Sequence, residues 1–214
     1  MKRLMLLLVL GVVGCGQPAV TESEAEGNRD SHQRMLAALR EVQARTADEH
    51  PYLGDRLRRQ YARQLSDLPV NAPPSMKVKM HWRLADAQLK SGQTQQAVEQ
   101  FLECSRLLRE AESVSPNAGQ VQDHLAMRLS VAYLRLAEDQ NCVNCRDEDC
   151  CIFPIRAGGV HRNKESARNA IKHLTEYLER NSADATATWL LNVAYMTLGE
   201  YPHGVPKAWL VPED

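Results

Sequence analysis

The residues of this sequence best suited to chemistry lie in one stretch with four closely spaced cysteines. They are Cys142, Cys145, Cys150 and Cys151, and His161 follows ten residues later. In an oxidising compartment such cysteines pair as disulfides, which is the simplest interpretation and would staple a long loop. As thiolates the same cysteines, with His161, could bind zinc, and the Cys-x-x-Cys spacing of Cys142 and Cys145 could support redox chemistry. The residues alone leave all three interpretations open.

No other part of the sequence contains a recognisable catalytic motif. A nucleophile elbow, a P-loop, a dinucleotide-binding fingerprint and a His-Glu-x-x-His metal site are all missing. Among the seven histidines only His161 stands out, by its place beside the cysteines, and a structural hydrogen bond is the simpler role for it. We therefore expect no enzyme, no catalytic residue and no cofactor.

The segments that must position the cysteines have the spacing of helices. Apolar residues recur at intervals of three and four from about residue 33 to residue 198. Between residues 76 and 112 they resemble the tetratricopeptide repeat, in which small residues let two antiparallel helices approach, a Phe fills the space between them and a Gly supports the turn. The residues that carry this pattern are Leu84, Ala85, Gly92, Ala97 and Phe101. Cys104 lies on the same buried stripe, and we expect it to be unpaired.

Further helices continue this pattern. The first helix of a second pair is expected at residues 125–137, and its partner at 164–180. The first helix of a third pair is expected at residues 184–198. The residues expected in their cores are Leu129, Tyr133, Ala170, Leu174, Trp189, Leu191 and Tyr195. We predict an all-α fold of antiparallel helix pairs, stacked as a short tetratricopeptide-like solenoid over residues 32–200, with a disulfide-rich loop inserted at residues 141–161.

Residues 1–14 have the layout of a secretory signal. Lys2 and Arg3 precede an apolar run that is too short to span a bilayer. The run ends at Gly14-Cys15, which resembles the lipobox of bacterial lipoproteins, where the cysteine is acylated and becomes the new N-terminus. The resemblance implies lipidation of Cys15 and anchoring to a membrane. Gly16 after it implies delivery to the outer membrane, facing the periplasm or the cell surface.

Two segments flank the predicted helical domain. Residues 15–31 are small, polar or acidic, and we expect a flexible tether. Residues 201–214 contain three prolines, which exclude a partner helix, together with apolar residues that would need a cover. Without its signal the chain carries 24 basic and 27 acidic residues, a net charge of −3. Nucleic acid is therefore not expected as a partner, because its binding requires clustered basic residues.

Six segments carry a second resemblance. They are Tyr133–Leu136, Asn141-Cys142, Cys151–Ile155, Gly159–His161, Trp189–Pro202 and Val205–Lys207. In them the chain resembles the helical N-terminal region of large exported proteins that continue into FG-GAP-type β-propeller repeats and an ASPIC/UnbV domain. The resemblance implies a Cys142–Cys151 disulfide, and Cys145 with Cys150 would then form a second one. Calcium binding is not implied, because the sequence stops at Asp214, where the propeller would begin. A stand-alone module or a truncated reading frame is expected.

Together these features predict a membrane-anchored scaffold for protein interactions. Stacked helix pairs form a concave groove, lined by the first helix of each pair, that would hold a protein or an extended peptide. Residues beside the buried stripes, such as Arg83, Thr188 and Asn192, could face that ligand. The alternative is a metal-binding or thiol redox protein centred on the loop from Cys142 to Cys151.

Overall fold

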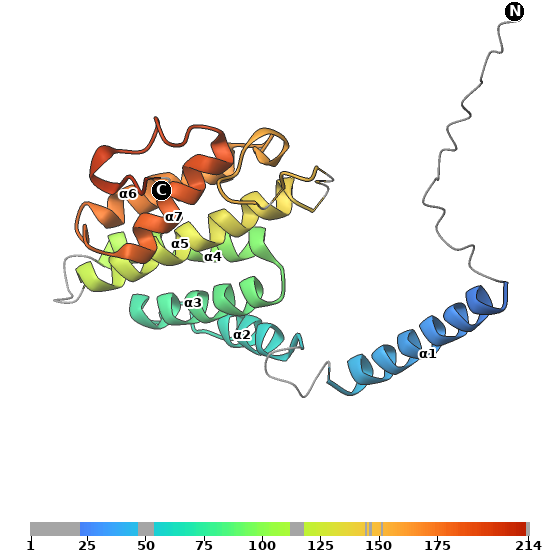
Figure 1. Cartoon of the computed structure of the whole chain (residues 1–214). Coiled ribbons are helices and arrows are strands. Elements are labelled where there is room, and N and C mark those ends of the chain that lie inside the picture. Colours follow the sequence, from blue (N-terminus) through green and yellow to red (C-terminus); the bar gives the residue numbers. More distant parts are fainter. Residues whose placement is uncertain are drawn as a thin grey trace, which may run out of the picture. The chain divides into compact units, whose positions relative to one another are not determined.

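The computed structural model describes residues 22–46, 54–111, 118–143, 145, 147–150 and 152–212 of the 214-residue chain. These residues form seven α-helices and two short 3-10 helices, and no strand occurs among them. The elements are α1 (Glu22–Thr46), α2 (Arg56–Ser66), α3 (Pro74–Lys90), α4 (Thr94–Ala111), α5 (Ala118–Asn141), η1 (Ala157–Gly159), α6 (Glu165–Leu178), α7 (Ala185–Leu198) and η2 (Lys207–Trp209). The all-α prediction is confirmed (Figure 1).

The chain divides into two compact units, residues 1–46 and residues 47–214. The first contains α1, which begins at Glu22, so residues 22–31 are helical although a flexible tether was expected there. The segment contains no proline and only one glycine, so nothing in it interrupts a helix. The predicted signal and Cys15 lie outside the described residues. Within the described part, no helix has the length and apolar character needed to cross a bilayer.

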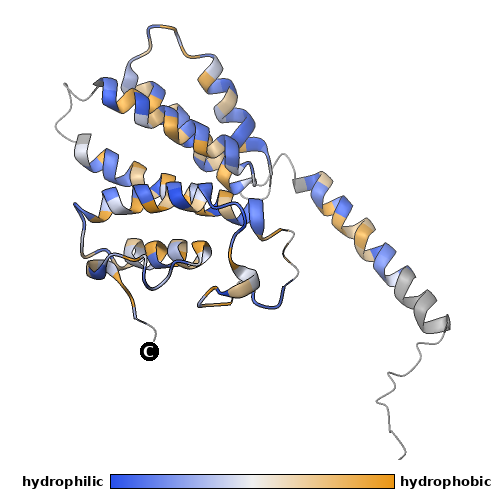
Figure 2. Ribbon diagram, turned by 90° about the horizontal axis from the view of Figure 1, so that it is seen from above, coloured by the Kyte–Doolittle hydropathy of each residue, from blue (hydrophilic) through white to orange (hydrophobic). Residues whose placement is uncertain are grey.

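In the second unit the helices stack in chain order. Each of the helices from α2 to α6 packs against the next one along the chain (Figure 1). Each of these helices combines hydrophilic and hydrophobic residues (Figure 2), as expected for helices with one buried side. The predicted stacking of helix pairs is confirmed. Contacts between neighbours along the chain are the defining property of a solenoid.

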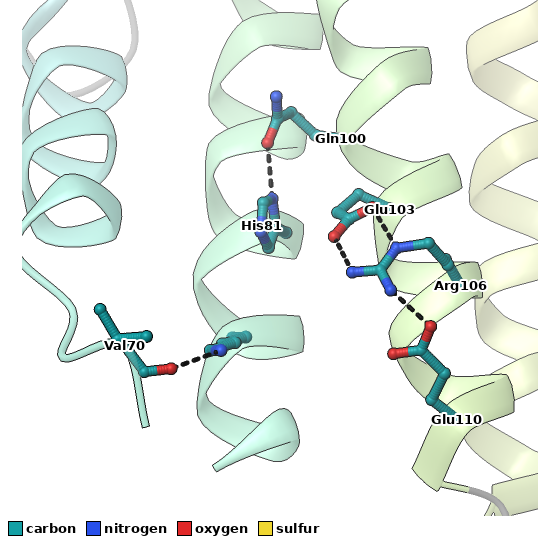
Figure 3. Close-up of polar contacts among 7 residues, drawn as sticks. Val70, His81, Gln100, Glu103, Arg106 and Glu110 are labelled. Carbon is teal, nitrogen blue, oxygen red and sulfur yellow. Dashed lines mark hydrogen bonds and ion pairs between the residues drawn. The ribbon is translucent and has the colours of Figure 1, made fainter. Parts of the chain in front are cut away.

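The pair formed by α3 and α4 has the predicted core. Gly92 joins the two helices with a φ of +74°, a conformation that glycine adopts without strain. Ala85 and Ala97 are fully buried where the helices approach, and Phe101 fills the space between them. On the surface of the same pair, the His81 Nδ1 and Gln100 Oε1 atoms lie 2.7 Å apart and link the helices (Figure 3).

Cys104 of α4 lies in the centre of this core. It is fully buried and unpaired, as expected. Its thiol lies 3.5 Å from the Val78 carbonyl oxygen of α3. Burial raises the pKa of the Cys104 thiol to about 12, so the group stays protonated at neutral pH and packs as a small apolar side chain.

Helices α5, α6 and α7 form the other half of the core. Most of the expected core residues are buried there, namely Leu129, Ala170, Leu174 and Leu191. Tyr133 and Tyr195 are half-buried, and Trp189 is 44% exposed, so its assignment to the core was wrong. The face of α7 that meets the core carries Ala187, Leu191, Ala194 and Leu198. That spacing directs Trp189 outward.

The segment after α7 folds back over that helix. Asn192 is fully buried, and its Nδ2 donates to the Trp209 carbonyl oxygen (2.7 Å) while its Oδ1 accepts from the Val211 N–H (3.1 Å). The Tyr201 hydroxyl donates to the Val211 carbonyl oxygen at 2.6 Å. The tail therefore covers α7 itself, and Asn192 holds this tail instead of facing a ligand.

Candidate functional site

Two asparagines hold the cysteine loop at its base. Asn141, in the last turn of α5, donates from Nδ2 to the Asn163 carbonyl oxygen (3.0 Å) and accepts at Oδ1 from the Asn163 N–H (2.9 Å). The same Nδ2 also donates to the Ala137 carbonyl oxygen (2.8 Å). Because the two ends of the loop are bonded to each other, the loop leaves the helix stack and returns to it at one point.

The last part of the loop is bound to the C-terminal end of α7. The His161 N–H donates to the Thr197 carbonyl oxygen, and the Lys164 ammonium donates to the Leu198 carbonyl oxygen, both at 2.8 Å. These carbonyls belong to the last turn of the helix, where no further backbone N–H is available within the helix. The loop joins α5 to α6 in the chain, and these hydrogen bonds also fix it to the end of α7.

Within the loop, Cys145 and Cys150 form a disulfide, with their Cα atoms 6.5 Å apart. The bend that this bond closes packs against Gly158 and Gly159. A Cβ atom at Gly159 would lie 2.7 Å from the Asp149 carbonyl oxygen, and one at Gly158 would overlap the carboxylate of Asp147. The glycine pair is therefore required by close packing inside the loop.

The cysteine pairing bears on the three interpretations of this motif. The Cys145–Cys150 bridge is present, whereas Cys151, and with it the implied Cys142–Cys151 bridge, lies outside the described residues. Sulfurs in a disulfide are not thiolate ligands, so the proposed metal set of four cysteines and His161 loses two members. In the part of the chain that the structure describes, no three His, Cys, Asp or Glu side chains are grouped to hold a metal ion.

His161 is the most deeply buried titratable side chain of the loop among the residues described, with 4% of its surface exposed. Its Nε2 lies 3.5 Å from the Cys142 sulfur, and its Nδ1 is buried with no hydrogen-bond partner among the described residues. Burial lowers the pKa of His161, against a smaller opposing effect of Glu138. The ring is therefore neutral at neutral pH.

A cavity of about 1030 Å³ lies between the loop, α5 and α7. On α5 the lining residues recur at intervals of three and four and thus share one helical face. The principal lining residues are Val131, Leu134, Arg135 and Glu138 of α5, Leu190, Val193 and Thr197 of α7, and Cys142, Phe153, Ile155, Val160, His161 and Arg162 of the loop. Seven of these side chains are aliphatic or aromatic, and the volume suits a ligand or part of a peptide.

Exposed apolar side chains adjoin the cavity. Phe153 of the loop is 53% exposed, and its ring lies 5.5 Å from the ring of Trp189. Ile152 and Val143, also in the loop, are 59% and 75% exposed. Large aromatic and aliphatic side chains left in contact with water beside a cavity are typical of a surface that binds another protein.

The structure brings several of the predicted site residues together. Cys142, Cys145, Cys150 and His161 all line the cavity. Sequence reasoning missed its apolar walls, formed by residues such as Leu134 and Val193. One signal was available, because residues 185–198 are apolar around the whole helix, which indicates a helix with neighbours on every side.

Comparison with known proteins adds no further assignment. No family model, curated protein or solved structure matches the chain. The candidate site therefore rests on the geometry of this cavity and on the chemistry of the residues that line it.

Proposed function

We propose that this protein is a membrane-anchored helical scaffold that binds an extended segment of a partner protein between α5, α7 and the cysteine loop. The observation that carries the proposal is the cavity of about 1030 Å³, with apolar walls supplied by three separate elements. Extended peptides are bound in this way in the grooves of stacked helix pairs, where pockets accept some of their side chains.

The lining residues favour a particular kind of segment. Leu134, Leu190 and Val193 suit an apolar side chain of the partner, and the Phe153–Trp189 pair can stack on a second one at the entrance. The exposed carboxylate of Glu138 on the cavity wall can accept a hydrogen bond from the same segment. Burying apolar side chains would supply most of the binding energy, and the single polar contact would fix the position of the segment.

The cellular location remains part of the proposal. The lipobox-like Gly14-Cys15 supports export and acylation, and a disulfide in the loop is expected in the oxidising environment of an exported protein. We also propose that the helix pairs are tetratricopeptide-like and that they correspond to the helical region of exported FG-GAP and ASPIC/UnbV proteins. The turn at Gly92 and the buried Phe101 support the tetratricopeptide-like assignment, and the six sequence segments between Tyr133 and Lys207 support the second one.

The test is a peptide selection on the full chain, followed by affinity measurements on variants. Peptides selected from a random display library would be titrated against the Phe153→Ala and Val193→Lys variants. The matched control is Leu102→Ala on α4, because Leu102 is a similarly exposed apolar residue (41%) that does not line the cavity. We expect at least a tenfold loss of affinity in the two cavity variants, since truncating an interface hot spot costs at least about 2 kcal/mol and a factor of ten corresponds to about 1.4 kcal/mol. Equal affinity in all three variants would refute the proposed site.

A further inference from the structure

Positive charge is concentrated at one end of the helix stack. Residues 54–93, which include α2 and α3, contain eight Lys or Arg residues and three Asp residues, a net charge of +5. The whole chain has a net charge of −1, so the remaining residues are together acidic. This separation gives the two helices a potential that differs in sign from that of the rest of the protein.

On α2 the basic residues share one face. Arg56, Arg59 and Arg63 are all exposed, and their spacing of three and four places them side by side. Together with Gln60, Gln64 and Asp67 they line a shallow depression of about 400 Å³. The helix itself contains no acidic residue, and Asp67 follows its last residue. The opposite face carries Leu57 and Tyr61, which are half-buried.

Of these three arginines, Arg59 lies 3.8 Å from the Asp55 carboxylate, whereas Arg56 and Arg63 are not neutralised in the way that other arginines of the protein are. On α4, Arg106 is bonded to both Glu103 and Glu110 (Figure 3). By contrast, neither Arg56 nor Arg63 has an acidic partner among the described residues. Their guanidinium groups are therefore available to anions outside the chain.

The adjacent helix adds to the positive charge of this end of the stack. Lys79, Arg83 and Lys90 of α3 are exposed at intervals of four and seven residues. The Arg83 guanidinium carbon lies 5.8 Å from the centre of the Tyr61 ring, on the face of α2 opposite its three arginines. We call Arg56, Arg59 and Arg63 of α2 the basic surface.

We propose that the basic surface docks onto the anionic phospholipid headgroups of the membrane to which the protein is anchored. Guanidinium groups bind phosphate oxygens through two parallel hydrogen bonds, and three guanidinium groups along one helical face suit a plane of many phosphates. The partner is a lipid surface because the proposed acyl anchor at Cys15 lies only 41 residues before Arg56. An acyl anchor so near in the chain keeps α2 at a high local concentration of headgroups. This contact goes beyond peptide binding in the cavity; it rests on the proposed membrane anchor at Cys15 and not on the peptide site.

The test uses vesicle sedimentation. The chain from Gly16 to Asp214, without an acyl group, contains every helix described and packs its core from residues 54–212. It would be sedimented with vesicles of phosphatidylglycerol and phosphatidylcholine, and with phosphatidylcholine vesicles alone. The test variant is Arg56→Gln/Arg59→Gln/Arg63→Gln. The charge-matched control is Arg106→Gln/Arg109→Gln/Lys172→Gln, which removes three exposed cations from α4 and α6. Thermal unfolding checks that both variants fold.

We expect binding to the anionic vesicles alone, weakened by added salt. Because each basic residue near an anionic surface contributes a factor of about five, the α2 variant should bind about a hundredfold more weakly, and the control should bind nearly as well as the wild type. Equal binding to both kinds of vesicle, or an equal loss in the two variants, would overturn the proposal. So would binding to soluble polyglutamate without binding to vesicles, which would identify an acidic protein as the partner.

Discussion

The Asn192→Leu substitution tests how the tail is fastened to the helix stack. Leucine has the same branching and number of side-chain heavy atoms as asparagine but removes the donor to the Trp209 carbonyl oxygen and the acceptor for the Val211 N–H. Each buried hydrogen bond contributes about 0.5–1.5 kcal/mol net, so the two together account for about 2 kcal/mol. If the tail stayed in place, two backbone groups would be left unpaired at about 1–3 kcal/mol each, so we expect the tail to detach.

We therefore expect the free energy of unfolding to fall by about 2–3 kcal/mol, which corresponds to a decrease in Tm of roughly 4–12 °C for a unit of this size. Urea unfolding measures the first quantity. Amide hydrogen exchange at Val211 reports the release of the tail directly, because that N–H is bonded to Asn192 alone among the described residues. The control is Ser130→Ala, which removes a buried hydroxyl bonded within α5 to the Ala126 carbonyl oxygen (2.8 Å) and should leave the Val211 amide protected.

A second substitution shows whether the tail leaves as one piece. The Tyr201 hydroxyl also bonds to Val211, so Tyr201→Phe should cost about 1 kcal/mol in the wild type and almost nothing once Asn192 is replaced. An Asn192→Leu variant that keeps both its stability and the protection of the Val211 amide would refute this reasoning. Additive effects of the two substitutions would show that the tail remains bound.

Four further predictions concern the core and the loop. Phe101→Ala should lower the free energy of unfolding by about 3–5 kcal/mol in urea titrations, because the ring is fully buried between α3 and α4. Burial raises the pKa of the Cys104 thiol from 9.0 to about 12. The stability that the buried, protonated thiol contributes is therefore complete below about pH 9 and is lost as the pH rises toward 12, which should lower the urea midpoint of unfolding. Cys104→Ala should abolish this decline of the midpoint. A thiol reagent at neutral pH should modify Cys104 only after unfolding. Replacing Cys145 and Cys150 with serine should cost at most about 2 kcal/mol in urea, because the bond closes a short loop, and should weaken binding of the selected peptides by loosening the cavity wall.

Residues that act over short sequence distances made much of the fold predictable. The pair α3 and α4 follows from the spacing of Ala85, Ala97 and Phe101 around one turn at Gly92, and all four positions lie as expected. Such spacing encodes which side of each helix is buried, because the two helices are neighbours in the chain. The single error among the core residues, Trp189, falls on a helix that is apolar on all sides, where spacing cannot indicate the inward face.

The candidate site depended on contacts that the sequence does not encode locally. The cavity forms because the loop after α5 is bonded to the end of α7, through His161 with Thr197 and Lys164 with Leu198, over 30 residues apart. Asn192 likewise bonds to a segment 17 to 19 residues later. The cysteine spacing indicated that the loop was special, but its wall of α7 side chains required the three-dimensional structure.

The central claim is that a partner segment occupies the cavity between α5, α7 and the cysteine loop. Hydrogen exchange of the full chain, with and without a selected peptide, tests this claim most directly. The account predicts slower exchange at residues 131–142, 152–163 and 190–197, which contain the cavity walls, and no change along α4. Slower exchange confined to α2, α3 or α4, with none around the cavity, would contradict it.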